Sequence, residues 1–224
     1  MYFRLMEIDF INTNHKKTKR NYLARVNSVN KAKAAKLAKK WGFDYWDGSR
    51  DVNYGGYHYD GRWLPIAKKM IKFYKLKENA KILDVGCGKG FLIHEFKKLL
   101  PKCQVYGQDI SKYAIKNSKI EIKKYIKHGC ASKLKFKNNY FDLVISLNTL
   151  HNLYCYDLVK ALKEIERVSK KNKYLCVESY RNEKEKVNLL YWQVTCESFY
   201  TPLEWKWFFQ QSKYKGDYSF IYFK

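Results

Sequence analysis

Proline, paired cysteines and acidic side chains are all scarce in this chain of 224 residues. It has 3 prolines and 6 cysteines, and Asp and Glu together number 21 against 45 for Lys and Arg. The cysteines are widely separated, with no C-x-x-C pair and no His at zinc-ligand spacing, which excludes the common zinc and dithiol motifs. We read them as reduced, mostly buried thiols and expect no metal site.

Long apolar runs are missing as well. Charged residues interrupt positions 1–10, where a signal peptide would need an apolar core, and no later run is long enough to span a bilayer. We therefore expect a cytoplasmic protein that does not insert into a membrane.

The formal charge of +24 is the strongest bias in the composition. Such a charge ordinarily indicates nucleic acid or an anionic surface as a partner. Lysine greatly outnumbers arginine here, however, and Asn, Ile, Tyr and Phe are also abundant, a bias that an A/T-rich genome produces without selection for binding. The lysines are also scattered over most predicted helices instead of forming one stripe, which favours the compositional explanation over a polyanionic partner.

One short segment carries most of the functional information. An apolar strand, 81–85, contains Asp84, and Gly86, Gly88 and Gly90 follow at alternate positions before a predicted helix. Glycine lets a backbone turn sharply and pass close to a ligand, and the start of a helix offers free N–H groups and a positive dipole end. The segment predicts a site for a nucleoside-containing cofactor.

Two classes of cofactor compete for this segment. The dinucleotide fingerprint is G-x-G-x-x-G with an acidic residue about 20 residues later, whereas the spacing here is D-x-G-x-G-x-G with the acid on the strand itself. This resembles motif I of the class I S-adenosylmethionine-dependent methyltransferases, in which the acid and the glycine turn hold the methionyl end of the cofactor. The resemblance assigns Asp84, Gly86, Cys87, Gly88 and Gly90 to cofactor binding.

A second strand, 104–109, supports the same family. It ends at Asp109, where the family has the carboxylate that accepts both ribose hydroxyls, and Ile110 would then lie against the adenine. A carboxylate suits this role because it offers only acceptors. The alternative is that Asp109 caps the next helix, although Ser111 can fill that role.

The family resemblance is weaker at the third and fourth strands. Where the family often has an acid that contacts the adenine amino group, this chain has Cys130, followed by Ala131. A thiol is a weak hydrogen-bond partner, so we expect backbone groups and packing to hold the adenine. Leu147 and Asn148, at the carboxyl end of the fourth strand, should face the cofactor.

Strands and helices alternate from residue 81 onward, which implies parallel strands joined by crossover helices. The predicted strands are 81–85, 104–109, 126–130, 141–146, 174–179 and 218–223, and the predicted helices are 90–100, 112–122, 157–169 and 201–214. The resemblance implies an α/β, Rossmann-like, doubly wound and mostly parallel sheet in the order 3-2-1-4-5-(7)-6, with helices on both faces. It runs from about Leu76 to the C-terminus, so we divide the chain into an N-terminal extension, 1–75, and a methyltransferase domain, 76–224.

The extension holds a basic helix and an aromatic segment. Ser28 can cap a Lys/Ala-rich helix, 29–41, that ends at Gly42; a solvated helix packed by one narrow face and an RNA-binding arm are the two interpretations. The segment 45–63 combines glycines with many rings, which suits a lid or a substrate pocket. A structural coil packed on the sheet edge is the alternative. An amphipathic helix, 64–74, follows.

Several side chains outside the strands are candidates for ligand binding. Arg62 lies in the region from which the family often reaches the cofactor carboxylate, and its planar fork suits that group. The connection 181–200 is longer than a plain loop, and family acceptor pockets are commonly built from such insertions. The candidate acceptor-binding residues are Tyr54, Tyr57, His58, Arg181 and Trp192.

Methyl transfer from a sulfonium is an in-line displacement, so an enzyme mainly aligns the reactants and excludes water. A base is needed only if the nucleophile arrives protonated. His151 follows the fourth strand and could deprotonate a hydroxyl or an amine; packing against the next helix is the alternative. Glu178 ends the fifth strand at the same rim, where it could orient a hydroxyl, pair with a cationic acceptor or meet Arg181.

The leading functional hypothesis is an S-adenosylmethionine-dependent methyltransferase with a small-molecule acceptor. The segments 45–63 and 178–183 are similar to stand-alone bacterial methyltransferases encoded among surface-polysaccharide and nucleotide-sugar genes, which implies a sugar-like or carboxylated acceptor methylated on oxygen. A second hypothesis is methylation of tRNA or rRNA, favoured by the charge, although the chain has neither an N-P-P-Y/F motif nor a recognisable RNA-binding module. A third is a catalytically silent, cofactor-binding regulatory protein.

Overall fold

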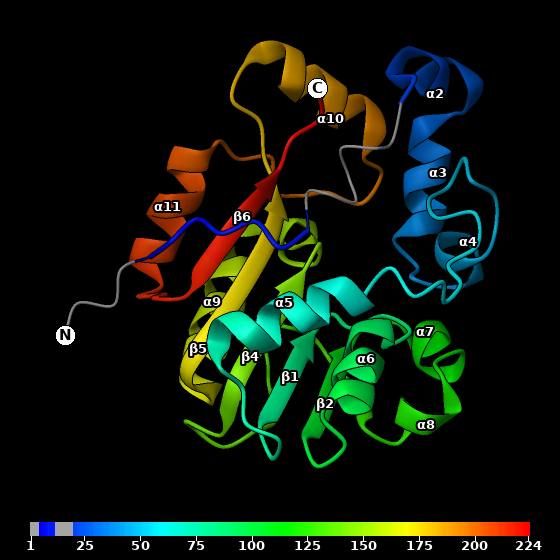
Figure 1. Ribbon diagram of the computed structural model, residues 1–224. Helices are drawn as coiled ribbons and strands as arrows, with labels where there is room; N and C mark the ends of the chain where they lie inside the picture. The colour runs from blue at the N-terminus through cyan, green and yellow to red at the C-terminus, as the bar shows by residue number, and fades with distance from the viewer. Residues whose placement is uncertain (1–4, 12–19) are drawn as a thin grey trace.

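A six-stranded parallel sheet forms the centre of the computed structural model, which describes residues 5–11 and 20–224 (Figure 1). The strands are β1 (Lys81–Val85), β2 (Gln104–Asp109), β3 (Ile126–His128), β4 (Phe141–Leu147), β5 (Ser169–Glu178) and β6 (Asp217–Ile221). Their order is β3-β2-β1-β4-β5-β6, and every neighbouring pair is parallel. This confirms the predicted Rossmann-like fold; within the described residues no further strand separates β5 from β6.

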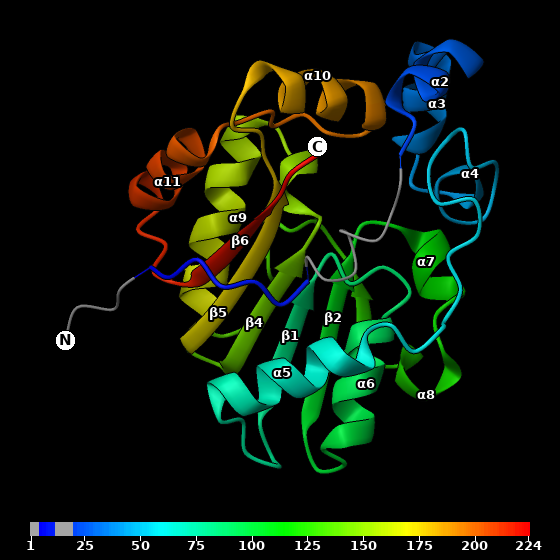
Figure 2. The same cartoon turned by 45° about the horizontal axis from the view of Figure 1, so that its top comes forward.

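Helices cover both faces of the sheet (Figure 2). On one face lie α5 (Leu64–Tyr74), α6 (Phe91–Leu99) and α8 (Ile120–Lys123), and on the other lie α9 (Cys155–Val168) and α11 (Pro202–Gln211). Side chains alternate along each strand, so Ile82 of β1 packs in the first layer, whereas Leu83 and Val85 pack in the second. Because both faces are covered, the central strands are apolar along most of their length.

The helix predicted over 112–122 is interrupted, and that prediction is wrong. The structure has α7 (Lys112–Lys116) and then the separate α8. Between them the Asn117 side chain donates to Tyr113 O at 2.8 Å, and Ser118 Oγ donates to Ile115 O at 2.8 Å. Side chains that bond the nearby backbone in this way compete with the helical pattern.

The basic helix predicted over 29–41 is also wrong in its bounds and its cap. The structure has α2 (Tyr22–Ser28) and α3 (Lys31–Ala38), and α4 (Phe43–Trp46) follows. Ser28 ends α2, and the side chain of Asn30, an equally favoured cap residue, accepts from Lys33 N to begin α3. The predicted cap, Ser28, is therefore wrong, and Asn30 caps the basic helix.

The connection 181–200 contains a helix that the sequence analysis missed, α10 (Glu183–Trp192). The Asn182 side chain caps it by accepting from Glu185 N, and acidic side chains occupy its first turn, so start signals were present. Helix α10 packs against α2 above the carboxyl ends of the strands (Figures 1 and 2). A capping box between Thr201 and Glu204 begins α11, the helix predicted over 201–214.

A short N-terminal stretch runs beside the last strand. Ile8 N donates to Tyr218 O at 2.8 Å, and Tyr218 N donates to Met6 O at 3.0 Å, which gives a parallel bridge at the outer edge of β6. This pairing covers a strand edge that would otherwise expose backbone groups. No helix in the described residues is long and apolar enough to cross a membrane.

Candidate active site

A cavity of about 410 Å³ lies at the carboxyl ends of β1, β2, β4 and β5. The strand ends and the turns that follow them form its floor, and the extension and α10 form its roof. In open α/β sheets ligands bind at this edge, where the strand order reverses. Here that reversal is between β1 and β4, beside the glycine loop.

The glycine loop between β1 and α6 is closed by protein atoms on its outer side. Gly86 and Gly88 have φ values of 79° and 55°, which favour glycine. A Cβ at Gly86 would lie 2.1 Å from Thr149 Oγ1, and one at Gly88 would lie 2.6 Å from Trp46 Cη2. The close approach that excludes side chains from these two positions is therefore to Thr149 and Trp46, although both glycines also line the cavity.

Asp84 is 4% exposed and lines the cavity. Burial, reinforced by the charge of Asp109, raises the pKa of Asp84 to about 8. A buried carboxyl group whose pKa is raised in this way gains most from a cationic ligand, which would restore its ionised form. The side chain is thus suited to an ammonium group.

Asp109, at the end of β2, is held by two backbone donors. Its Oδ2 accepts from Gly88 N and its Oδ1 from Ser111 N, each at 2.7 Å. Burial raises the pKa of Asp109 despite these donors, and each oxygen keeps a lone pair for a further hydroxyl. Ser111 Oγ caps α7 by accepting from Ala114 N at 2.9 Å, so Asp109 is not needed there. Ile110 lines the cavity next to it, with 46% of its surface exposed.

The loops after β3 and β4 complete this end of the cavity. Cys130 and Ala131 line it, and Gln108 Nε2 fixes their loop by donating to Cys130 O at 2.7 Å. Asn148 also lines it with a left-handed backbone, φ 54°, and its buried Oδ1 has no hydrogen-bond partner. A buried acceptor without a partner is costly unless a ligand supplies a donor.

His151 and Glu178 meet on the floor of the cavity. His151, in η1 (Leu150–Asn152), is 2% exposed, and its Nε2 lies 3.5 Å from Glu178 Oε2. The backbone N–H of Glu178 donates to His151 Nδ1 at 3.4 Å, which leaves the ring proton of a neutral imidazole on Nε2. Burial lowers the pKa of His151 to about 3 and raises that of Glu178 to about 8, because it disfavours both charges.

The carboxyl group of Glu178 has one oxygen fixed and one available. Gln193 Nε2 donates to Glu178 Oε1, whereas Glu178 Oε2 is buried and makes no hydrogen bond. Both side chains line the cavity. Gln193 was not among the predicted site residues, since an amide just past the end of α10 has no sequence pattern that marks it.

The aromatic segment 45–63 forms much of the roof. Tyr54 and Tyr57 line the cavity together with Trp46. The rings also pack on one another and on the glycine loop: Trp46 and Tyr54 are stacked with centroids 5.3 Å apart, and Tyr57 stacks on Phe91 at 5.1 Å. The segment therefore combines features of both interpretations, a pocket wall and a packed coil.

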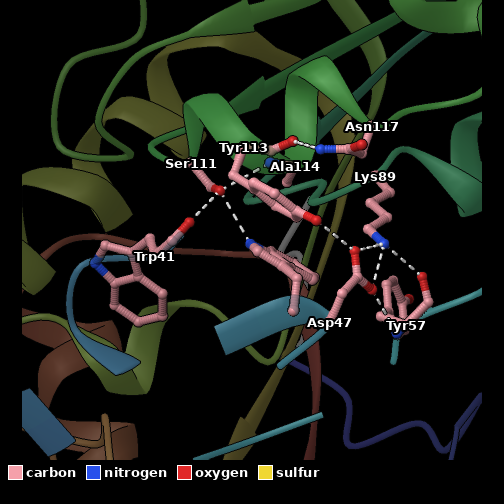
Figure 3. Close-up of polar contacts among 9 residues, drawn as sticks. Trp41, Asp47, Tyr57, Lys89, Ser111, Tyr113, Ala114 and Asn117 are labelled. Atoms are coloured by element: carbon pink, nitrogen blue, oxygen red, sulfur yellow. Dashed lines mark hydrogen bonds and ion pairs between the residues drawn. The ribbon is translucent and has the colours of Figure 1, made fainter. Parts of the chain in front are cut away.

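An ion pair fastens this roof to the glycine loop (Figure 3). Lys89, within the glycine motif, donates from Nζ to both carboxylate oxygens of Asp47 at 2.7 Å and to Tyr57 O at 2.9 Å. Tyr113 donates to Asp47 Oδ2 at 2.9 Å. Burial opposes the ionisation of Asp47, but these donors prevail and lower its pKa. We call the contact between Asp47 and Lys89 the roof latch. The sequence signal that could have predicted it is the lysine within the glycine motif.

A further hydrogen bond joins the roof to the second strand. Trp46 Nε1 donates to Ser111 Oγ at 2.9 Å, and the same hydroxyl donates to the backbone oxygen of Trp41 (Figure 3). Ser111 follows Asp109 closely in the chain, so this bond places the roof next to the proposed ribose position.

The remaining predicted residues lie at different distances from the cavity. Trp192 and Arg62 line it, and Arg62 forms an ion pair with Asp60 at 2.6 Å. Gly90 directly precedes α6 and is not part of the cavity wall. A Cβ there would meet Ile122. His58 and Arg181 are also outside the wall; Arg181 pairs with Glu185 and lies over the ring of Tyr222. We leave Gly90, His58 and Arg181 out of the proposed site. In the described residues, no group of three or more His, Cys, Asp or Glu side chains could hold a metal ion.

Comparison with known proteins agrees with this architecture. An uncharacterised methyltransferase of Schizosaccharomyces pombe is 32% identical over 119 residues, 48% of this chain and 41% of that protein. The ubiquinone biosynthesis O-methyltransferase of Pelagibacter ubique is 29% identical over 160 residues, 66% of this chain and 63% of that protein. The chain thus matches less than two thirds of either relative.

The fold and a family model lead to the same family. The crystal structure of the YcgJ protein from Bacillus subtilis aligns with a TM-score of 0.54 and 22% identity over 65% of this chain and 66% of that one, which shows the shared fold. A model of the methyltransferase domain matches residues 76–218. The chain therefore belongs to the methyltransferase-domain family and has the class I fold that its glycine motif predicted.

Proposed function

We propose that the protein transfers the methyl group of S-adenosylmethionine to a small-molecule acceptor. The observation that carries this proposal is the cavity, which is lined by the family's cofactor-binding strand ends, by aromatic rings and by the pair formed by His151 and Glu178. We retain the division into an extension, 1–75, whose segment 45–63 forms much of the roof, and a methyltransferase domain, 76–224.

The cavity residues fit the proposed cofactor, which supplies an electrophilic methyl group on a sulfonium. Asp84 would bind the ammonium group of its methionyl end, because this buried carboxyl group has a raised pKa. Asp109 would accept the ribose hydroxyls, Ile110 would cover one face of the adenine, and the orphaned Asn148 Oδ1 would accept from a donor of the ligand. Cys130, Ala131 and the glycine loop would contribute backbone contacts.

His151 and Glu178 would orient and deprotonate the acceptor. At neutral pH the Glu178 carboxyl is largely protonated, since its pKa is about 8, and its free Oε2 can bind a hydroxyl that enters the cavity. Once ionised, this carboxylate can accept the proton of that hydroxyl. His151 keeps Glu178 in place through two contacts, one to the backbone and one to the carboxyl group.

We infer that the methylated atom is oxygen and that the acceptor is sugar-like or carboxylated. A buried carboxyl base near an aromatic wall suits a hydroxyl acceptor, and the relative from Pelagibacter ubique is named an O-methyltransferase. A role in surface-polysaccharide biosynthesis rests on the resemblance of the segments 45–63 and 178–183 alone. The cysteines are free thiols, which suits action in a reducing cytoplasm.

The RNA hypothesis keeps one supporting observation, the formal charge of +24. The proposed acceptor end is roofed by α10 and the aromatic segment, and a flipped base would have to enter beneath them. The silent regulatory protein would bind the cofactor without turnover. These two hypotheses are therefore separated from the leading one by what enters the cavity and by whether a product forms.

The experiment that tests the proposal has two parts. Calorimetry with S-adenosylhomocysteine should show one saturable site, and incubation of the protein with labelled S-adenosylmethionine and small-metabolite pools should transfer label to a low-mass product. Transfer to total RNA, with retention that falls as salt rises, would replace the small-molecule acceptor by RNA. Binding without transfer to either pool would favour the regulatory protein, and absence of binding would refute the proposal.

A further inference from the structure

Three arginines surround the indole ring of Trp192 at the end of α10. The distances from the guanidinium carbon to the ring centroid are 5.1 Å for Arg20, 5.0 Å for Arg25 and 5.6 Å for Arg50. Arg20, Arg50 and Trp192 line the cavity, and Arg25 lies behind them in α2. We call Arg20, Arg25 and Arg50 the arginine rim. It brings two segments of the extension, 20–25 and 50, around a ring that is distant from both in sequence.

Backbone oxygens hold two of these guanidinium groups in place. Arg25 donates to Arg50 O at 2.8 Å and to Asp51 O at 3.2 Å, and Arg50 donates to Asn53 O at 3.0 Å and Tyr54 O at 2.9 Å. Carbonyl oxygens fix the positions of the guanidinium groups without neutralising their charge. The rim is therefore preorganised by the fold of the roof.

The arginines elsewhere in the fold have a different partner. Arg167 forms an ion pair with Glu164, and Arg181 forms one with Glu185 while it lies 4.1 Å from the ring of Tyr222. Among the described ion pairs, by contrast, none joins Arg25 or Arg50 to a carboxylate. Arg25 and Arg50 thus contact an aromatic ring as Arg181 does. Their charges, however, are oriented by backbone oxygens and are not neutralised by an ion pair.

Electrostatics in the rim shows the same imbalance. Burial and then the charge of Arg50 lower the pKa of Arg25, and Asp51 opposes them with a smaller effect. The charge of Arg20 acts to lower the pKa of Glu178, on the floor, against the larger effect of burial. Bringing like charges together costs free energy that a bound anion would recover.

We propose that the arginine rim binds an anionic group of the methyl acceptor, a carboxylate or a phosphate, while a hydroxyl of the same molecule reaches Glu178. Guanidinium groups form paired hydrogen bonds with either anion. The acceptor class is then a small hydroxylated organic anion with an apolar or ring body against Trp192. This inference rests on the proposed function, because it assigns the substrate of the same cavity.

The position of the rim separates it from the cofactor residues. Arg20 interacts electrostatically with Glu178 at the end of β5, whereas Asp84 and Asp109 end β1 and β2. The rim and the cofactor residues thus lie over different strands. A substitution in the rim should change anion binding and leave the cofactor affinity as it was.

The test uses three probes with the same phenyl ring, benzoate, phenyl phosphate and the neutral benzamide, titrated into the full-length protein with and without saturating S-adenosylhomocysteine. We expect benzoate or phenyl phosphate to bind about tenfold more tightly than benzamide. Arg20→Gln and Arg50→Gln, which change the two arginines that line the cavity, should each remove most of this preference and change the affinity for S-adenosylhomocysteine less than twofold. The control Lys98→Gln removes an exposed positive charge on α6 and should retain the preference.

Each outcome decides the proposal. Equal binding of benzamide and the two anions would overturn it, as would arginine variants that keep the preference while melting at the wild-type temperature. Arginine variants that lose affinity for S-adenosylhomocysteine instead would assign the rim to the cofactor. The protein could also prefer the anions through the rim but bind no S-adenosylhomocysteine. That result would support the rim as an anion-binding site and refute the methyltransferase proposal. Preference for phenyl phosphate over benzoate, or the reverse, identifies the anion.

Discussion

The two ends of the cavity differ in how the chain builds them. The proposed cofactor end comes from consecutive strand ends and the turns directly after them, with Asp84, Gly86 and Asp109 within one β-α-β stretch. The proposed acceptor end draws on Arg20, in the extension, and Trp192, at the end of α10, which are far apart in sequence. A site made from local backbone leaves a motif, whereas a site assembled from remote segments leaves only scattered candidates.

The roof latch joins these two ends. Lys89 belongs to the glycine loop and Asp47 belongs to the roof, and their ion pair is largely buried, with side-chain exposures of 5% and 16%. A change on either side of this contact should therefore show whether the two ends act separately or as one unit.

Removal of the carboxyl group at the acceptor end should have the largest effect. Glu178→Gln keeps an oxygen for Gln193 but removes the proton acceptor, so turnover should fall by a factor of about 10² to 10⁴, while the affinity for S-adenosylhomocysteine by calorimetry stays unchanged. Since the pKa of Glu178 is about 8 and the base is its ionised form, wild-type turnover should rise with pH through about 8. A variant with the wild-type rate and pH profile would remove Glu178 from the chemistry.

Removal of the carboxyl group at the cofactor end should spare the acceptor probes. Asp109→Ala loses two charge-assisted hydrogen bonds to ribose, worth about 3 kcal/mol or more together, so the affinity for S-adenosylhomocysteine should fall at least about a hundredfold. Because Gly88 N and Ser111 N also lose their acceptor, the melting temperature is measured in parallel. Asp109→Asn, which keeps one oxygen, should show a smaller loss. Unchanged affinity in Asp109→Ala would contradict the ribose assignment.

Breaking the roof latch should uncouple the two ends. Lys89→Met leaves Asp47 without its cation, and breaking such a buried pair costs about 3 kcal/mol. Hydrogen exchange should become faster in the segment 45–63 while β1 and β4 keep their protection. Lys170→Met, which removes the more exposed pair with Asp142, is the control and should cost about 1 kcal/mol or less. Equal exchange in wild type and Lys89→Met would show that ring packing alone holds the roof.

The smallest predicted effects compare two glycines with similar backbone strain. Gly61, with φ 78°, has open space where a Cβ would lie, so Gly61→Ala should cost about 1 kcal/mol of conformational strain. At Gly88, with φ 55°, the added methyl would also push against Trp46 in the roof. Urea unfolding should show a larger loss for Gly88→Ala, and tryptophan fluorescence should change in that variant alone. Equal losses would show that the contact between the glycine loop and the roof contributes nothing to the free energy of unfolding.

The parts of the fold that the sequence predicted are those in which local pattern and tertiary packing agree. The strand 81–85 and the helix 64–74 have the predicted bounds, because apolar spacing, turn residues and burial favour the same structure there. Two of the errors fall where two local signals compete. Asn30 and Ser28 are neighbouring cap candidates, and Asn117 and Ser118 interrupt a helix whose apolar pattern continues.

The candidate site shows the same division. The acids at 84 and 109 were identified from their positions near the carboxyl ends of two strands, and both line the cavity. Gln193 and the arginine rim were missed, because no periodicity or motif in the sequence marks a single amide or arginine as part of a site. Arg181, at a more prominent sequence position, pairs with Glu185 outside the cavity wall.

The sequence by itself determined the parallel sheet, the glycine turn and the acids at the ends of β1 and β2, since each follows from residue types a few positions apart. Only the tertiary structure decided that Trp46 closes the glycine loop, that Lys89 binds Asp47 and that three arginines meet at Trp192. These contacts depend on how the extension and α10 pack over the strand ends. Side-chain packing between remote segments is set by shape and burial in three dimensions, and no local spacing in the chain encodes it.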